Sequence, residues 1–168
     1  MKNTRDEQKE REEKRFNVVL YGVTESKHMD ATSKWNEEEL KKVKELAKHV
    51  GVELRGEVTV KWRCGRRSVE SVRKPRPLVV KLTDDETRAA LLQNSWRLSR
   101  IGGWERVFVS PDLTNAQREE KREEEKKLRE EAERKTEAAR IEGREETWIV
   151  KGQKGKKKIV LVERGHKS

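Results

Sequence analysis

Residues 59–81, TVKWRCGRRSVESVRKPRPLVVK, constrain the fold of the first two-thirds of the chain more than any other segment. Apolar and polar residues alternate at both ends of this segment, which predicts two strands, at residues 57–64 and 78–82. The segment contains eight Lys or Arg residues and one acid, Glu70, so its net charge is +7, against +10 for the whole chain. A basic loop beside a sheet can follow the phosphate backbone of a polyanion, and we therefore expect a nucleic acid as the partner.

The flanking sequence places other elements around these two strands. A strand is predicted at residues 16–23, followed by a helix that Asn36 caps and Gly51 ends. A second helix is predicted from the capping-box pattern of Thr83 and Glu86, with Ala89, Leu92 and Trp96 facing inward. A fourth strand is predicted at residues 106–110. The order β-α-β-β-α-β predicts an α+β, ferredoxin-like RNA recognition motif, with the first and third strands central and both helices on one face.

The rest of the chain predicts a smaller domain. Thr114 and Gln117 form a capping-box pattern that begins a charged helix extending to about Ile141. Two short apolar segments around a lysine-rich loop then predict a β-hairpin. We therefore expect a charged helical tail or linker at 1–15, an RNA recognition motif-like domain at 16–113, a helix–hairpin domain at 114–163 and a tail at 164–168.

Composition and spacing argue against several classes of protein. The 168 residues are 44% charged and 31% hydrophobic, with one cysteine and three scattered histidines. Such a chain has no disulfide framework, no metal-ligand spacing and no phosphate-binding glycine loop. It also has no apolar run of membrane-spanning length. We expect a soluble intracellular protein that is not an enzyme and has no cofactor, small-molecule substrate or membrane partner.

Strand alternation predicts which side chains lie on the sheet face opposite the helices, here called the open face. Val60, Trp62 and Cys64 are expected to point into the core, which leaves Lys61 and Arg63 on the open face. The same reasoning places two aromatic side chains there, Tyr21 and Phe108, among basic neighbours. Aromatic rings with basic surroundings are how proteins hold single-stranded nucleic acid.

Three segments carry a resemblance to a known family: NVVLYGVTES (17–26), PLVVKLTDDETRAALLQ (77–93) and RVFVSPDLT (106–114). Together with the Arg-Arg loop, their order and spacing resemble the RNA-binding region of the first open-reading-frame protein of LINE-type, non-LTR retrotransposons. The similarity covers about residues 16–162. The family has an atypical RNA recognition motif, a small C-terminal domain and a preceding trimeric coiled coil. Its members bind single-stranded nucleic acid, act as nucleic-acid chaperones and coat the RNA of the element.

The resemblance implies that the basic loop, the basic residues after the second helix and a pair early in the long helix bind RNA. With the open face and the hairpin loop, the candidate RNA-binding residues are Tyr21, Lys61, Arg63, Arg66, Arg67, Arg73, Lys74, Arg76, Lys81, Arg97, Arg100, Arg106, Phe108, Lys121, Arg122, Lys154 and Lys156. The chain departs from the family pattern in three respects. Val19 and Val79 occupy the usual stacking positions, the final helix of the C-terminal domain is missing, and at most the last turns of the coiled coil are present.

The resemblance implies single-stranded RNA as the main partner, single-stranded DNA as a second one, and a homo-oligomer formed through an upstream coiled coil. It implies a place in cytoplasmic ribonucleoprotein particles, or in the nucleus. The alternative is an assembly or scaffold protein that acts through its charged helices, although the absence of a heptad repeat argues against a strong coiled coil. Binding to duplex DNA is the weakest alternative, because no helix has the pattern of a major-groove reader.

Overall fold

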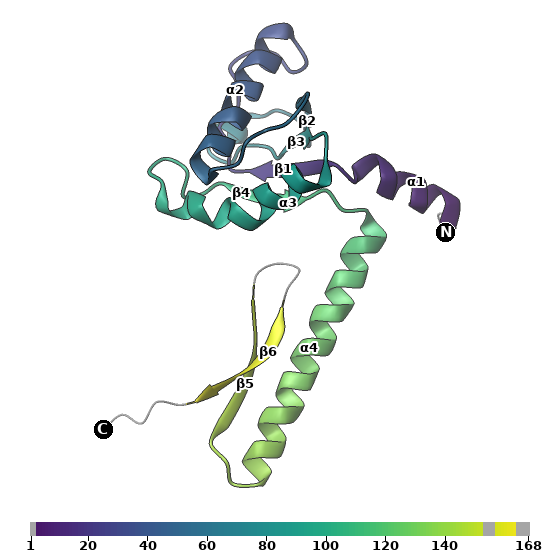
Figure 1. The fold of residues 1–168 in the computed structure, drawn as a ribbon, viewed down its shortest axis with the longest axis vertical. Coiled ribbons are helices and arrows are strands. Elements are labelled where there is room, and N and C mark those ends of the chain that lie inside the picture. Colours follow the sequence, from purple (N-terminus) through teal and green to yellow (C-terminus); the bar gives the residue numbers. More distant parts are fainter. Residues whose placement is uncertain (1–2, 153–156, 164–168) are drawn as a thin grey trace. The chain divides into compact units, whose positions relative to one another are not determined.

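The computed structural model describes residues 3–152 and 157–163 of the chain and divides into two units, Met1–Asp112 and Leu113–Ser168 (Figure 1). Unit 1 contains α1 (Thr4–Lys14), β1 (Asn17–Tyr21), α2 (Ser33–Val50), β2 (Thr59–Arg63), the 3-10 helix η1 (Val69–Val72), β3 (Leu78–Lys81), α3 (Asp85–Asn94), the 3-10 helix η2 (Ser95–Arg100) and β4 (Phe108–Pro111). Unit 2 contains α4 (Asn115–Ile141), β5 (Glu146–Lys151) and β6 (Lys158–Glu163).

The centre of unit 1 is a four-stranded sheet in the order β2-β3-β1-β4, in which every neighbouring pair is antiparallel. The α+β class is confirmed, and β1 and β3 are the central strands, as expected. One face of the sheet packs against the helices. Its core includes Val18 and Leu20 from β1, Leu78 and Val80 from β3, and residues of α2, α3 and η2. Val107, which precedes β4, belongs to the same core, so the inward direction of Val107 and Val109 is also confirmed.

A β-bulge in β2 reverses the predicted direction of its later side chains. Val60 lies opposite Val80, but the next paired residue on β2 is Trp62, which lies opposite Val79. Lys61 is therefore the extra residue, and every side chain after it turns to the other face. Trp62 lies on the open face and is 50% exposed, whereas Arg63 is buried. The predictions that Trp62 and Cys64 point inward and that Arg63 is open are therefore wrong, and Cys64 is exposed.

The buried Arg63 forms an ion pair with Glu39 of α2, at 2.6 Å, and both side chains are fully shielded from solvent. Its two terminal nitrogens also donate to the backbone carbonyls of Val23, Thr24 and Arg76, at 2.9, 3.0 and 2.7 Å. The Nε of Arg63 has no hydrogen-bond partner among the described residues. The second carboxylate oxygen of Glu39 accepts the backbone N–H of Ser26 at 2.9 Å. This pair therefore joins β2, α2, the approach to β3 and the loop between β1 and α2.

The helix starts differ from two of the predicted caps. Helix α2 begins after Thr32, whose hydroxyl accepts the backbone N–H of Trp35, so Asn36 lies inside the helix and is not its cap. Glu39, expected to complete a box with Asn36, pairs with Arg63 instead. Helix α3 begins after Asp84, which accepts the backbone N–H of Thr87 at 2.7 Å. On this helix and η2 the buried residues are Thr87, Leu91 and Leu98, while Ala89 and Trp96 are exposed, contrary to the expected inward face.

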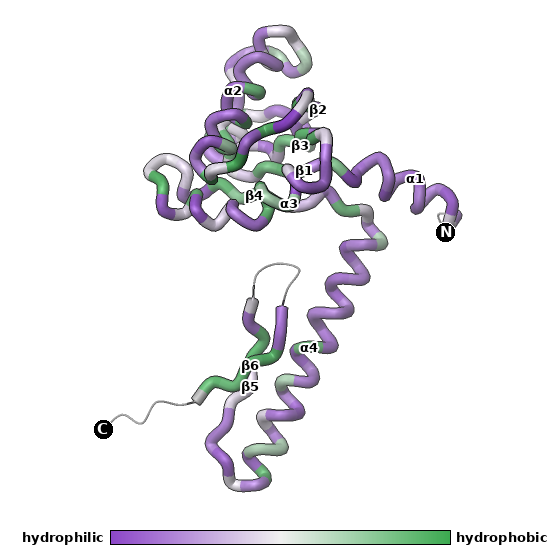
Figure 2. The backbone as a smooth tube through the Cα atoms, viewed as in Figure 1, coloured by the Kyte–Doolittle hydropathy of each residue, from purple (hydrophilic) through white to green (hydrophobic). Residues whose placement is uncertain are grey.

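Unit 2 is a long helix packed on a two-stranded sheet. The capping box at Thr114 and Gln117 is confirmed, and the hairpin is observed where it was expected. Figure 2 shows apolar stretches on β5 and β6 beside a largely polar α4, of which Ala132 and Ala139 are buried. The hydroxyl of Thr136 accepts the backbone N–H of Trp148 at 2.9 Å and fixes the hairpin to the helix.

The Arg63–Glu39 pair provides a stability test. Arg63→Met leaves the buried carboxylate of Glu39 with only its longer ion pair to Lys42, at 3.3 Å, so we expect a loss of about 3–5 kcal/mol in the free energy of unfolding, measured by urea denaturation. The double variant Glu39→Met/Arg63→Met is expected to recover the part of this loss that comes from the unpaired charge, but not the part that comes from the backbone groups that lose their hydrogen-bond partners. Arg66→Met is the control, because Arg66 is exposed. A loss of less than about 1 kcal/mol in Arg63→Met would show that the pair does not organise the core.

Candidate nucleic-acid interface

Three exposed aromatic side chains share the open face of unit 1. Trp62 belongs to the edge strand β2, Phe108 to the opposite edge strand β4, and Tyr21 to the central strand β1, directly opposite Phe108. They are 50%, 63% and 38% exposed, respectively. The exposure expected for Tyr21 and Phe108 is therefore observed, and Trp62 is an additional member that strand alternation had assigned to the core.

Short apolar side chains form the centre of this face. Strand pairing aligns Trp62, Val79, Val19 and Ser110 in one row across the four strands. Val19 and Val79 are buried although they lie on the face away from the helices. With strands about 4.8 Å apart, Trp62 and Ser110 are separated by about 14 Å. Trp62 and Phe108 thus lie on the two edge strands, Tyr21 lies beside Phe108 on β1, and the short side chains of Val19 and Val79 lie between Trp62 and this pair.

The charge next to Trp62 comes from the bulged residue. The ammonium nitrogen of Lys61 lies 5.4 Å from the centroid of the Trp62 ring, a cation–π contact. Lys81 is exposed and, through its pairing with Thr59 and Asn17, lies on the same face. Aromatic and cationic groups therefore occur together on this surface.

Two more arginines of the basic loop bind the loop between β1 and α2. Arg76 is buried and forms ion pairs with Glu25, at 2.6 Å, and Asp30, at 2.9 Å. Arg67 donates to the backbone carbonyls of His28, at 2.7 Å, and Ser26. Like Arg63, these two arginines are paired with carboxylates or backbone carbonyls of the protein itself. The candidate RNA-binding arginines therefore fall into two groups: those with partners inside the protein and those without.

The carboxylates of this network have shifted pKa values. Burial opposes ionisation of Glu25, but the hydrogen bonds from Arg76 outweigh it and hold the pKa of Glu25 below its ordinary value. The hydrogen bond from Arg76 likewise lowers the pKa of Asp30, against a smaller opposing effect of burial. The hydrogen bonds that Arg76 donates to Asp30 and Glu25 raise the pKa of its guanidinium. The network is therefore fully charged at neutral pH.

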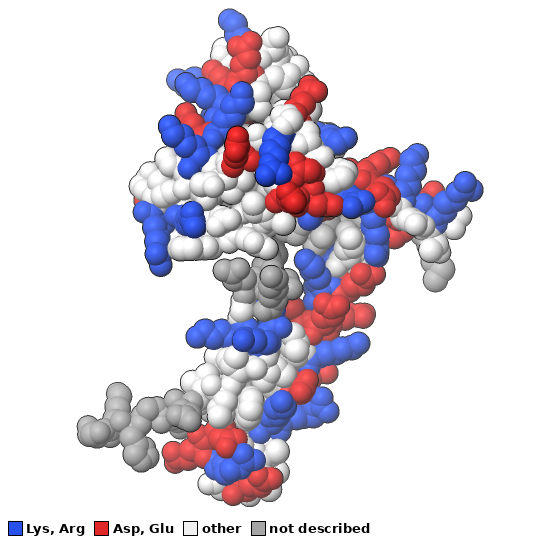
Figure 3. All heavy atoms as spheres, viewed as in Figure 1, with Lys and Arg blue, Asp and Glu red and all other residues white. Residues whose placement is uncertain are grey.

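The remaining cations of unit 1 include exposed side chains for which no hydrogen bond or ion pair is found among residues 3–152 and 157–163. They are Arg66, Arg73, Lys74, Lys81 and Arg106. Arg97 and Arg100 are also exposed and lie on η2, beside Trp96. In the view of Figure 3, Lys and Arg side chains also gather over α2, whereas both signs of charge alternate along α4. Phosphate binding requires cations that no carboxylate already neutralises, and the loop and η2 provide them.

The candidates in unit 2 have a weaker structural basis. Lys121 is half-buried and Arg122 is exposed on α4, while Lys154 and Lys156 lie outside the described residues.

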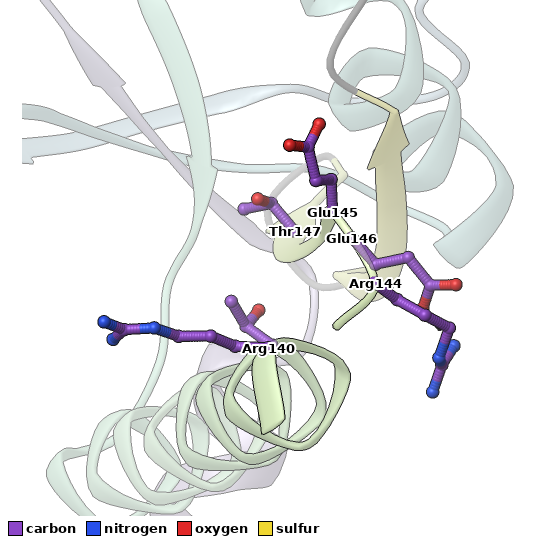
Figure 4. Close-up of a pocket in the computed structure, with 6 residues that line it drawn as sticks. Arg140, Arg144, Glu145, Glu146 and Thr147 are labelled. Atoms are coloured by element: carbon purple, nitrogen blue, oxygen red, sulfur yellow. The ribbon is translucent and has the colours of Figure 1, made fainter. Parts of the chain in front are cut away.

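A pocket of about 350 Å³ lies between α4 and β5, lined by Thr136, Arg140, Arg144, Glu145, Glu146 and Thr147 (Figure 4). Figure 4 shows Arg144 beside Glu146, with which it forms an ion pair at 2.6 Å, while Arg140 points away. Arg144 therefore brings no uncompensated charge to this pocket.

Comparisons with known proteins give no family for this chain. No protein-family model matches the sequence, and no curated protein matches it. Within the part of the chain that the structure describes, no group of three or more His, Cys, Asp or Glu side chains could hold a metal ion. No helix in that part is long and apolar enough to cross a membrane.

The acidic network predicts how stability depends on pH. Because the folded-state pKa values of Glu25 and Asp30 are lowered, the unfolded chain binds more protons, and the stabilisation is present above their unfolded values, about 4.3 and 3.9. It is lost as the pH falls through the folded values. Glu25→Gln/Asp30→Asn is expected to flatten the rise of unfolding free energy between about pH 3 and pH 6, measured by urea titrations. Lys27→Gln, in the same loop, is the control, and parallel curves for all three proteins would contradict the assignment.

Proposed function

We propose that the protein binds single-stranded RNA through the open face and the basic loop of unit 1. The observation that carries the proposal is the presence of Trp62, Tyr21 and Phe108, all exposed, on the sheet face that the helices leave uncovered. A base that is unpaired can stack on such rings, with a gain of about 1–3 kcal/mol per base. Arg66, Arg73 and Lys74 supply charge for the phosphates that connect those bases.

The same face supports low sequence specificity. Reading a base requires amide, carboxylate or hydroxyl groups that reach its edge. Of the polar residues of this kind on the open face, Asn17 and Ser110 are buried, and Thr59 is exposed at the beginning of β2. The amide of Asn17 already donates to the carboxylate of Asp112 at 3.0 Å. Stacking and phosphate contacts, which every sequence offers, therefore dominate the proposed interaction, and single-stranded DNA is a second ligand of the same chemistry.

The wider biological role rests on the resemblance. We assign unit 1 to the ferredoxin-like, RNA recognition motif arrangement, on the basis of its element order and its two central strands, β1 and β3. Similarity to the LINE-type family then favours a nucleic-acid chaperone that coats the RNA of a retrotransposon in cytoplasmic or nuclear ribonucleoprotein particles. In this family oligomers form through a coiled coil, so the proposed oligomer rests on the resemblance alone.

The aromatic face predicts the effect of a single substitution. Trp62→Ala removes one stacking surface and is expected to weaken binding of a mixed-sequence, single-stranded RNA by roughly 5- to 150-fold, measured by fluorescence anisotropy. Trp62→Phe keeps a ring and is expected to retain most of the affinity. Met29→Ala, an exposed apolar residue of unit 1 outside the sheet, is the matched control. Equal affinity for single-stranded and duplex RNA of the same length would rule out stacking on this face.

The basic loop predicts the salt dependence. The slope of log K against log salt concentration falls by about 0.7 for each lost phosphate contact with a single strand, so Arg66→Ala/Arg73→Ala/Lys74→Ala is expected to reduce it by about two. The control is Lys34→Ala/Lys44→Ala/Lys48→Ala, which removes the same charge from exposed positions on α2. If the two triple variants behave alike, the loop has no specific role. If the wild-type protein has no measurable RNA affinity at physiological salt, the scaffold alternative is favoured.

A further inference from the structure

Strand β6 of unit 2 has an outer edge whose backbone groups are unpaired. In antiparallel pairs, opposed residues alternate between those that exchange backbone hydrogen bonds and those whose N–H and C=O point away from the other strand. Trp148 on β5 is of the second kind, because its N–H donates to the hydroxyl of Thr136 on α4. Its pairing residue is Leu161, so the N–H and C=O of Leu161, and those of Ile159 two residues earlier, point away from β5. Within the described residues β6 pairs only with β5, and no hydrogen bond to these outward groups is found.

The two edges of the hairpin therefore differ. Helix α4 packs more closely on β5 than on β6, and Thr136 already contacts the outer edge of β5. The outer edge of β6 has no such cover, and Leu161 and Val162 are 39% and 38% exposed. Residues 159–162, IVLV, include no charge and no proline, which are features that keep edge strands from pairing with other chains. The outer edge of β6 can therefore accept a further strand.

The sequence of β6 complements itself in antiparallel pairing. Only outward groups can pair across the new edge. When Ile159 pairs with Leu161 of a second copy, Val160 lies opposite its own counterpart, and the central pairs are all apolar. Lys157, which precedes β6, then lies level with Glu163 of the other copy. A shift of the register by two residues in one direction places Ile159 opposite Glu163. A shift in the other direction places Leu161 opposite Lys157.

We propose that two copies of this chain associate through the outer edges of β6, antiparallel about a two-fold axis at Val160, and form one four-stranded sheet from two hairpins. The contact is isologous, because each copy supplies the same edge. The outer strands of the combined sheet are then the two β5 strands, which α4 already contacts, so the assembly stops at a dimer. A contact of this size is weak, and we expect a dissociation constant on the order of 10⁻⁵ M. The proposal concerns unit 2 and does not depend on RNA binding by unit 1.

Cysteine cross-linking tests the register. Cys64 is the only cysteine, so Cys64→Ser provides the background for single cysteines in the full-length chain. Val160→Cys places two cysteines opposite each other in a pair without backbone bonds, with Cα atoms about 4.5 Å apart, which a disulfide can bridge. Val162→Cys is the matched control, because Val162 is more exposed and lies on the same face, but about 14 Å from its counterpart. Under mild oxidation we expect Val160→Cys to form covalent dimers roughly tenfold faster than Val162→Cys.

Sedimentation of the full-length, nuclease-treated protein measures the association itself. From about 1 µM to about 500 µM, the wild type is expected to shift from monomer to dimer. Leu161→Pro removes an outward N–H but no hydrogen bond within the hairpin, and is expected to remain monomeric throughout. Leu161→Thr is the control, because it keeps the N–H and suits a strand, and is expected to dimerise within about tenfold of the wild-type concentration.

The other outcomes overturn the proposal. A wild type that is monomeric at every concentration has no such interface, and dimers that persist in Leu161→Pro form through another surface. Equal cross-linking rates for Val160→Cys and Val162→Cys would show that the edges do not pair in this way. Faster cross-linking of Leu161→Cys than of Val160→Cys would place the two-fold axis at Leu161 and contradict the register. The affinity of Leu161→Pro for RNA, expected to equal that of the wild-type monomer, tests the proposed function separately.

Discussion

The ion pair between Arg63 and Glu39 is the interaction on which most of unit 1 depends. Both side chains are fully buried, so the charge of Arg63 requires the carboxylate of Glu39. Three backbone carbonyls accept from the terminal nitrogens of Arg63, and the backbone N–H of Ser26 donates to Glu39. Lys42 adds a longer ion pair to Glu39, at 3.3 Å. A single side chain of β2 thereby fixes the position of α2, of the loop after β1 and of the segment that leads into β3. Hydrophobic burial alone is not directional and would not specify these loop positions.

The same ion pair determines which side chains are exposed on the open face, where we propose that RNA binds. Arg63 enters the core only because β2 contains a bulge at Lys61, and the bulge that buries Arg63 also exposes Trp62. The packing requirement on one face thus exposes an aromatic ring on the other. Arg67 and Arg76 extend the network to the acidic loop after β1 and keep the ends of the basic loop close to the sheet. The side chains between them, among them Arg66, Arg73 and Lys74, are left exposed.

Because some arginines of the basic loop are paired within the protein and others are not, the net charge of the loop overstates the charge that a ligand can contact. A net charge of +7 over residues 59–81 suggests a uniform phosphate-binding surface, but the acids that neutralise Arg63 and Arg76 come from residues 25–39, distant in sequence. The surface that remains for a polyanion is smaller and more localised than composition indicates. It adjoins the aromatic side chains on the open face of the sheet, while η2, with Trp96, Arg97 and Arg100, lies on the other side.

The sequence by itself determined the order of the elements, the central position of β1 and β3, the capping box of α4 and the exposure of Tyr21 and Phe108, because alternation, periodicity and capping are local patterns. It did not determine the direction of Trp62, Arg63 and Cys64, since a one-residue bulge reverses alternation and its position depends on pairing with β3. Nor could it show which arginines are neutralised, or that Trp96 lies exposed beside Arg97 and Arg100. Those features were decided only by the tertiary structure, because a buried charge must find a partner wherever the fold places one.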